Sequence, residues 1–237
     1  MPTISFLPAN NILIGTAPEP EPTTLNIPSW WKEQPTTING EQHIVDGSYK
    51  FTVKKCQAIF DALATGYVLK APVDIFIDSK KERHEAQVPY DWKHASPLII
   101  SSHPREQVSM MPIDKSIFMP DILRIHPLWV VKTPPGYSTL FLPPMHGKDL
   151  PIEMVPGVID TDTFVTDGHL SFFVKRNFNG VIKQGTPIAQ ILPFKREDWD
   201  HIIHDYDANT IERQRKKIRS TFSNGYRMKF WSKKEYR

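Results

Sequence analysis

The sequence predicts a mainly β protein built from short strands that rigid loops connect. The 237 residues include 22 prolines and 11 glycines, and the prolines are spread along the whole chain. Because proline is poorly tolerated inside helices and central strands, such a chain favours short strands with proline-fixed connections. β domains of this length often form one unit. We expect an extended arm (residues 1–36), a β-rich core (37–195) and a helical tail (196–237).

Most of the predicted strands are short apolar runs between turn residues. They are expected at 67–78, where a proline divides two strands, and at 99–111, 128–131, 138–142, 157–160, 170–175, 181–182 and 188–194. The polar stretch 79–97 between the first two is expected to be a hairpin or a long loop. The run TPPGY at 133–137 predicts a turn that joins the strands on its two sides.

Two segments have the apolar spacing of helices rather than strands. Residues 53–63 place five apolar residues on one helical face, with Gly66 following as a stop signal. Cys56 lies on that face, so we expect it in the core rather than at a reactive site. The second helix is expected over 196–219, with Trp199, Ile202, Ile203 and Tyr206 on one side and a possible break at Asn209.

Cysteine usage and hydropathy exclude two classes of protein. A single cysteine rules out an internal disulfide framework and fits a reducing compartment. The first residues lack the basic and apolar regions of a signal peptide, and no apolar run approaches the roughly 20 residues of a membrane helix. We therefore expect a soluble cytoplasmic protein that does not contact a membrane.

Both ends of the chain carry features of interaction segments. The arm contains Trp30 and Trp31 directly after a proline, and disordered tails are poor in aromatic residues. We expect these tryptophans to hold the arm against its own domain or a neighbouring subunit; a platform on which a ligand stacks is the alternative.

The tail is basic and aromatic. Residues 209–237 contain ten Lys or Arg and two Glu, a net charge of +8, and since the whole chain carries +3, residues 1–208 carry −5. Arg215, Lys216, Lys217 and Trp231 are the candidate contact residues. They suit either nucleic acid or an acidic protein surface, and the acidic body favours the protein partner.

Three motifs resemble, in order, those of the dUTPase and dCTP deaminase superfamily. They are TPPGYSTL at 133–140, GVIDTD at 157–162 and GTPIAQI at 185–191, and ATGYVLKA at 64–71 is a looser fourth. The resemblance implies a β-clip core of strongly twisted strands and a homo-oligomer, most often a trimer, with sites between subunits. It also implies that Asp160 stands where the family's general base activates water, with Asp162 beside it, and that Mg²⁺ would offset a triphosphate.

The same resemblance marks ligand-binding positions and several departures from the family. Tyr137, Lys148, Phe164 and Gln190 occupy ligand-binding positions. The family's arginine–serine phosphate motif is replaced by PPMHGK at 143–148, which leaves Lys148 or His146 as the nearby cation, and no glycine-rich tail closes the chain. One oxyanion-type donor is typically worth about 2.7–4 kcal/mol in rate, so losing several argues against ordinary dUTPase activity.

The wider pattern resembles an uncharacterised family of bacteria and tailed phages. The shared segments are IPSWW at 27–31, PGYS at 135–138, GVID at 157–160 and PFKRE at 193–197. This resemblance brings no known activity with it. A phage structural or accessory protein, in the host cytoplasm or the virion, is one hypothesis, with other virion or host proteins as candidate partners.

Two hypotheses about function follow. The first is a non-enzymatic binding or assembly protein on a dUTPase-like core, without a cofactor. The alternative is a nucleotide-binding or nucleotide-hydrolysing enzyme that uses Asp160 as general base and Mg²⁺, with a rebuilt phosphate site around Lys148, Lys175 or Arg196. No metal site is predicted: His201 and His204 share one side of the expected helix, but at i, i+3 without the intervening glutamate of zinc helices.

Overall fold

The computed structural model describes residues 1–9, 15–42, 49–80, 84–89, 98–147, 149–166, 168–221 and 225–236. Its elements, in chain order, are β1 (Ser5–Pro8), β2 (Glu21–Pro22), η2 (Thr23–Asn26), α1 (Ser29–Glu33), β3 (Thr37–Gln42), β4 (Tyr49–Phe51), η3 (Val53–Lys55), α2 (Gln57–Ala64), β5 (Tyr67–Lys70), β6 (Ile75–Asp78), β7 (Glu85–Gln87), β8 (Ile100–His103), η5 (Arg105–Val108), β9 (Phe118–Ile125), β10 (Trp129–Lys132), β11 (Tyr137–Leu142), β12 (Ile152–Met154), β13 (Gly157–Ile159), β14 (Leu170–Lys175), β15 (Asn179–Ile182), β16 (Pro187–Lys195), α3 (Ala208–Arg219) and α4 (Gly225–Lys229). The predicted mainly β fold is confirmed.

The strands form a cluster of small antiparallel sheets that share one core. A five-stranded sheet has the order β13-β11-β16-β5-β2, a four-stranded sheet the order β12-β14-β9-β8, and a three-stranded sheet the order β15-β6-β7. Two further pairs are β1 with β10 and β3 with β4. The core contains side chains from the three larger sheets, such as Leu69, Ile77, Leu123, Phe172 and Ile191, all almost completely buried.

Most predicted strands are found, but their pairing differs from the sequential expectation. β10 and β11 lie on either side of the 133–137 turn, yet β10 pairs with β1 while β11 pairs with β13 and β16. β13 and β14 are consecutive in the chain, yet they lie in different sheets. The strand expected over 99–111 ends at His103, since Pro104 is followed by the 3₁₀ helix η5. The hairpin expected within 79–97 is present where described, because β6 pairs with β7.

The first 36 residues are held against their own domain. β1 pairs with β10, and β2 adds to the five-stranded sheet beside β5. The arm is not extended throughout, because α1 turns Trp31 inward, where it is buried beside Phe60, with ring centroids 6.0 Å apart.

The predicted helix over 53–63 begins later than expected. Residues 53–55 form a 3₁₀ turn, and Cys56 has φ −80° and ψ 103°, an extended conformation that separates this turn from α2. Cys56 is consequently exposed, so its predicted place in the core is wrong. The apolar spacing was counted across a break in the helix, which displaced residues 53 and 56 from the common face.

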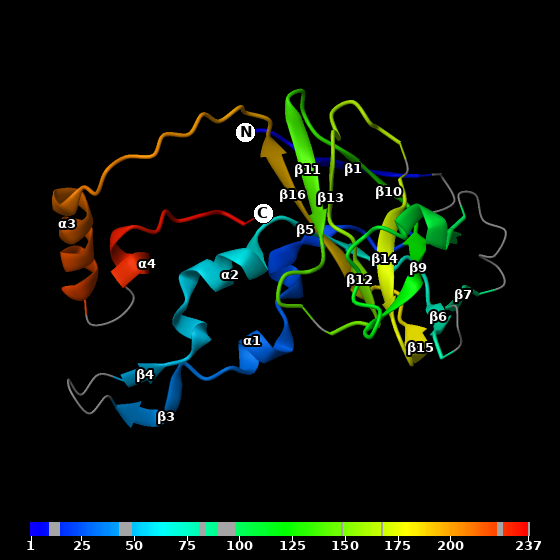
Figure 1. The fold of residues 1–237 in the computed structure, drawn as a ribbon, viewed down its shortest axis with the longest axis horizontal. Coiled ribbons are helices and arrows are strands. Elements are labelled where there is room, and N and C mark those ends of the chain that lie inside the picture. Colours follow the sequence, from blue (N-terminus) through cyan, green and yellow to red (C-terminus); the bar gives the residue numbers. More distant parts are fainter. Residues whose placement is uncertain are drawn as a thin grey trace.

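The helix predicted over 196–219 is wrong for its first half. Residues 196–207 are extended, and α3 starts at Ala208 because Asp207 Oδ1 accepts a hydrogen bond from the Thr210 amide at 3.0 Å. Asn209 is in the first turn rather than at a break. His201 and His204 lie in the extended part, so they share no helical face. No residue of α3 is buried, and the segment carries this helix away from the sheets before α4 and the C-terminal residues return (Figure 1).

Among the described residues, no helix is long and apolar enough to cross a membrane.

Candidate functional site

A tight turn brings two of the sequence motifs together. Within 134–137, Pro135 and Gly136 take the central positions, and the Tyr137 amide donates to the Pro134 carbonyl at 3.2 Å. Gly136 has φ +84°, which is the geometry that a type II turn requires at this position and that glycine adopts without strain. The turn leads into β11, whose pairing with β13 places residue 138 close to the loop after β13.

Asp160 and Asp162 lie in that loop and have different environments. The Asp162 side chain is 5% exposed, and its Oδ2 accepts a hydrogen bond from the Gly136 amide at 2.8 Å. The Asp160 side chain is 61% exposed, and its Oδ1 accepts a hydrogen bond from Ser138 Oγ at 2.6 Å. Asp162 therefore fastens the turn to the loop, whereas Asp160 keeps a solvent-facing carboxylate.

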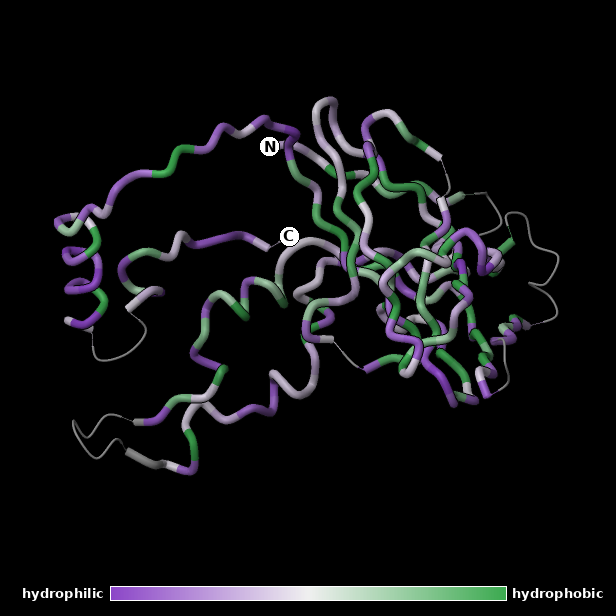
Figure 2. The backbone as a smooth tube through the Cα atoms, viewed as in Figure 1, coloured by the Kyte–Doolittle hydropathy of each residue, from purple (hydrophilic) through white to green (hydrophobic). Residues whose placement is uncertain are grey.

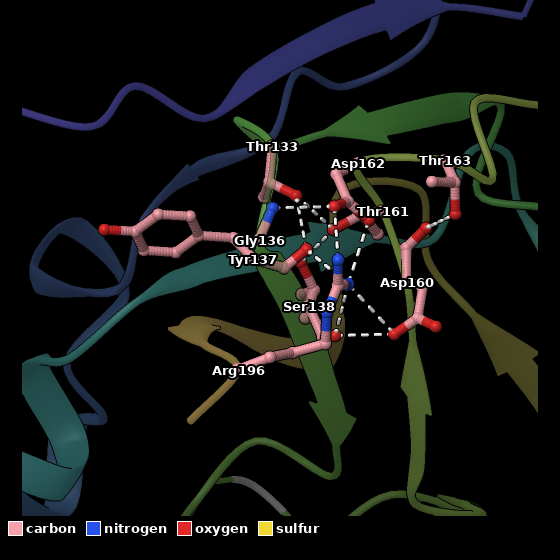
Figure 3. Close-up of polar contacts among 10 residues, drawn as sticks. Thr133, Gly136, Tyr137, Ser138, Asp160, Thr161, Asp162, Thr163 and Arg196 are labelled. Atoms are coloured by element: carbon pink, nitrogen blue, oxygen red, sulfur yellow. Dashed lines mark hydrogen bonds and ion pairs between the residues drawn. The ribbon is translucent and has the colours of Figure 1, made fainter. Parts of the chain in front are cut away.

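Arg196 lies between the two carboxylates (Figure 3). Its guanidinium donates to both carboxylate oxygens of Asp162, with Nη1 2.9 Å from Oδ1, and Nη1 lies 3.2 Å from Asp160 Oδ1. Nη1 also donates to Ser138 Oγ at 3.0 Å. The pairing of β16 with β11 positions this residue, and the Arg196 amide donates to the Gly136 carbonyl at 2.8 Å. The arginine is thus an internal partner of both acids.

The electrostatics follow from this bidentate pair. The hydrogen bonds from Arg196, followed by that from the Gly136 amide, lower the pKa of Asp162 from 3.8 to about 2. The same pair raises the pKa of Arg196 above its ordinary value. Two carboxylates and one guanidinium leave one negative charge, which repels a triphosphate. Among the described residues, no group of three or more His, Cys, Asp or Glu is arranged to hold a metal ion.

Three buried threonines support the loop from beneath. Thr161 Oγ1 lies 2.7 Å from Thr133 Oγ1 and 2.8 Å from Thr139 Oγ1, and Thr133 Oγ1 donates to the Tyr137 carbonyl at 3.1 Å. Because a buried hydroxyl needs a partner, this chain of hydroxyls fixes the relative position of the turn and both aspartates.

Two of the predicted ligand-binding residues, Tyr137 and Gln190, do not point toward the carboxylates. The Tyr137 ring points away from Arg196 (Figure 3) and lines a separate cavity of about 300 Å³ with residues 1–4 and Tyr67. Phe164 is half exposed. The Gln190 amide is buried and bonded to three backbone groups, those of Met145, Ala62 and Thr65.

Of the two lysines expected at the rebuilt phosphate site, the structure describes Lys175. Lys148 lies outside the described residues. Lys175, on β14, forms an ion pair with Asp149. Of the three predicted cations, Arg196 alone among the described residues meets the aspartates, and it does so as their salt-bridge partner.

The predicted contact residues divide between surface and interior. Trp30 is partly exposed and donates from Nε1 to the His146 carbonyl at 2.8 Å, whereas Trp31 is buried. Arg215, Lys216 and Lys217 lie on α3, which has no buried residue. Trp231 is turned inward and donates from Nε1 to Asp61 Oδ2 at 2.9 Å.

Ser138 and Asp61 are residues whose roles the sequence did not reveal. Ser138 stands within the PGYS run, but only the strand register shows that it faces Asp160. In the sequence, Asp61 is only one polar residue within α2. In the structure, it accepts hydrogen bonds from the side chains of Gln57, Trp231, Lys234 and Tyr236. The contacts of Asp61 with the C-terminal residues span more than 160 positions, so no local sequence signal identifies them.

No protein-family model and no curated protein matches the chain. Among solved structures, it is similar to a mutant dUTPase from phage phi11 of S. aureus that coordinates a structural Mg(II) ion, with 9% identity and a TM-score of 0.38, covering 87% of this chain and 99% of that one. It is also similar to a mutant dUTPase of Staphylococcus bacteriophage 80alpha with dUpNHpp, with 10% identity and a TM-score of 0.36, covering 87% and 90%.

Both structures are dUTPases, the enzymes that the three sequence motifs resemble. Because the identities are 9–10% and the TM-scores are below 0.5, the likeness says nothing about the activity, ligands or partners of this chain.

Proposed function

We propose that the protein is a non-enzymatic assembly protein, in which the extended segment 198–206 of one copy packs against a second copy of the chain. The observation that carries this proposal is the exposure of four large apolar side chains in this segment. Trp199, Ile202, Ile203 and Tyr206 are 65–91% exposed. Figure 2 shows this segment as an isolated, extended part of the chain with a hydrophobic stretch between polar ends.

An apolar group of this size in an extended, projecting segment is typical of a protein–protein contact. α3, at the far end of the segment, buries none of its residues, and its neighbour in the fold is α4. The charge division supports a second copy as the partner, since residues 1–208 carry −5 and the following residues carry +8. A trimer is the expected assembly, and other virion or host proteins remain further candidate partners.

The environment of the aspartates also favours assembly over catalysis. Asp162 is occupied by a backbone amide and by Arg196, so it acts as a turn-stabilising group. The guanidinium that could neutralise a phosphate is already paired with both acids. A nucleotide would have to compete with these internal pairs.

The assembly proposal is tested by sedimentation of the wild type and of a Trp199→Ser/Ile203→Ser variant over a range of concentrations. Burying a large apolar side chain contributes about 1.5–3 kcal/mol, so losing two weakens association by about 3 kcal/mol or more, a factor of about a hundred or greater. Met110→Ser is the matched control, because Met110 is 94% exposed and lies outside the segment. A wild type that is monomeric throughout, or equal effects of both variants, would refute the proposal.

Nucleotide hydrolysis with Asp160 as general base is the second candidate, favoured by one observation: the Asp160 carboxylate is solvent-facing and adjacent to a serine and an arginine. Thermal unfolding with a panel of nucleotides, with and without Mg²⁺, tests it on the wild type and Asp160→Ala. A ligand at 100 times its dissociation constant stabilises by about 2.7 kcal/mol. A nucleotide-specific rise that Asp160→Ala weakens would support the enzyme, and no response to any nucleotide would reject it.

A further inference from the structure

Three histidines and an arginine meet at the four-stranded sheet. Arg124 is near the end of β9, His126 directly follows that strand, and His169 directly precedes β14. The His169 ring centroid lies 5.3 Å from that of His126 and 5.8 Å from that of His103, the last residue of β8. Arg124 Nη1 lies 3.2 Å from His169 Nε2.

The strand register places two serines on either side of the arginine. Ser101 on β8 and Ser171 on β14 are both paired with Arg124. Side chains alternate between the faces of a sheet, and the neighbours Leu123 and Ile125 belong to the buried core. Ser101, Arg124 and Ser171 therefore project from the opposite face, as one row of hydrogen-bonding groups.

Two groups in this row are buried without a hydrogen-bond partner among the described residues: Arg124 Nε and Ser101 Oγ. A buried polar atom of this kind requires an explanation, because nearly all such atoms in folded proteins are paired. Here both belong to cross-strand neighbours, and both can donate. An unpaired guanidinium N–H beside an unpaired hydroxyl is the arrangement that an oxyanion satisfies.

The charges around His169 are also those of an anion site. Burial, then the charges of Arg124, His126 and His103, lower the pKa of His169. His103 Nδ1 is bonded to the side-chain amide of Gln107. The adjacent η5 adds Arg105 and Glu106, whose charges oppose each other. Arg124 supplies a permanent positive charge to the cluster.

We propose that Ser101, Arg124 and His169 form a binding site for a phosphate group, carried by free phosphate or by a phosphate ester. The planar guanidinium presents a fork of donors that matches phosphate oxygens, and the serine hydroxyl supplies another donor. With a neutral ring, His169 Nε2 accepts the Arg124 N–H. When the ring is protonated, Nε2 becomes a donor, and a phosphate oxygen can then accept from both side chains.

This arrangement couples phosphate binding to proton uptake by His169. Burial and the charges of Arg124, His126 and His103 lower the pKa of His169, and a bound phosphate anion offsets those charges, so that the ring gains a proton more readily in the complex. Affinity is consequently expected to rise as the pH falls from 8 to 6, through the range in which histidine titrates.

The test is a calorimetric titration of the full chain with inorganic phosphate and with methyl phosphate at pH 6 and pH 8. The expected result is saturable binding to one site, about tenfold tighter at pH 6, a change of about 1.4 kcal/mol. The ester binding more tightly would identify an esterified ligand, and the reverse order would identify free phosphate. Absence of saturable binding at pH 6 would overturn the proposal.

Two variants and a matched control assign the site. Arg124→Gln is expected to abolish binding, and His169→Gln to retain binding at pH 8 while losing the increase at pH 6. Arg176→Gln is the control, because Arg176 directly follows the other end of β14 and this substitution also removes one positive charge. Equal loss in the control would show a general charge effect and refute the site. Arg124→Lys, with partial binding and unchanged melting temperature, separates loss of the site from loss of the fold.

Discussion

Replacing Gly66 with alanine tests how α2 is joined to the five-stranded sheet. Gly66 follows the last turn of α2 and has φ +76°. An added Cβ would lie 2.1 Å from the carbonyl oxygen of Ile191 on β16, far inside van der Waals contact. The contacting atom is a backbone atom of a central strand, so it cannot move aside without disturbing the sheet. The Gly66 carbonyl also accepts a hydrogen bond from the Thr23 amide at 3.0 Å, which ties the arm to the same point.

Gly185→Ala supplies a matched control for the backbone contribution. Gly185 has φ +81°, but its added Cβ would meet no atom within 4 Å. A left-handed conformation costs a non-glycine residue about 1–2 kcal/mol, and both variants have this cost. Overpacking against a fixed neighbour adds about 1–3 kcal/mol for Gly66→Ala alone. The expected losses are therefore about 1–2 kcal/mol for the control and about 2–5 kcal/mol for Gly66→Ala.

Thermal unfolding measured by circular dichroism distinguishes the two contributions. For a domain of this size, 1 kcal/mol corresponds to a change of about 2–4 °C in Tm. Gly66→Ala is expected to lower Tm by about 4–20 °C, and Gly185→Ala by about 2–8 °C. Equal decreases in the two variants would refute the close approach of Gly66 to β16, because the backbone contribution alone would then account for both.

Two further predictions concern buried or shielded acids. Burial raises the pKa of Asp121, but the interaction with His84 lowers it by more and leaves the pKa below 3.8. His84 Nδ1 lies 3.0 Å from Asp121 Oδ2. The ionised Asp121 therefore stabilises the folded state above pH 3.8, and this stabilisation is lost as the pH falls through the lower folded-state pKa. We expect Tm to decline more steeply in acid for the wild type than for Asp121→Asn. Asp61→Asn should weaken the contacts that hold Trp231 and Tyr236 to α2, giving faster amide exchange after residue 229 without change in the β core; unchanged exchange there would contradict this role of Asp61.

Local patterns predicted the β class and many of the strands. Alternating or continuous apolar runs identify a half-buried or buried strand wherever it pairs, so β5, β6, β11 and β16 lie where the sequence placed them. The PPGY run likewise predicted its turn, because proline and glycine restrict the backbone through their own covalent structure. These features depend on neighbours in the chain and need no knowledge of the fold.

The same local reasoning failed where a segment has no surface to pack on. Residues 196–207 have helical apolar spacing, yet they are extended, because most helical stability comes from packing an apolar face and this segment has none available in its own chain. Cys56 was misplaced for a related reason, since one extended residue interrupts the periodicity.

The sequence by itself determined the strand-rich character of the chain, its turn chemistry, the order of its motifs and the division between an acidic body and a basic tail. The tertiary structure alone decided which strands pair, that Arg196 neutralises Asp162, and that Arg124 meets three histidines. These are contacts between residues far apart in the chain, and they exist only after several sheets have closed on a common core. Composition and periodicity describe neighbouring residues, so they carry no information about which distant side chains the closed core brings into contact.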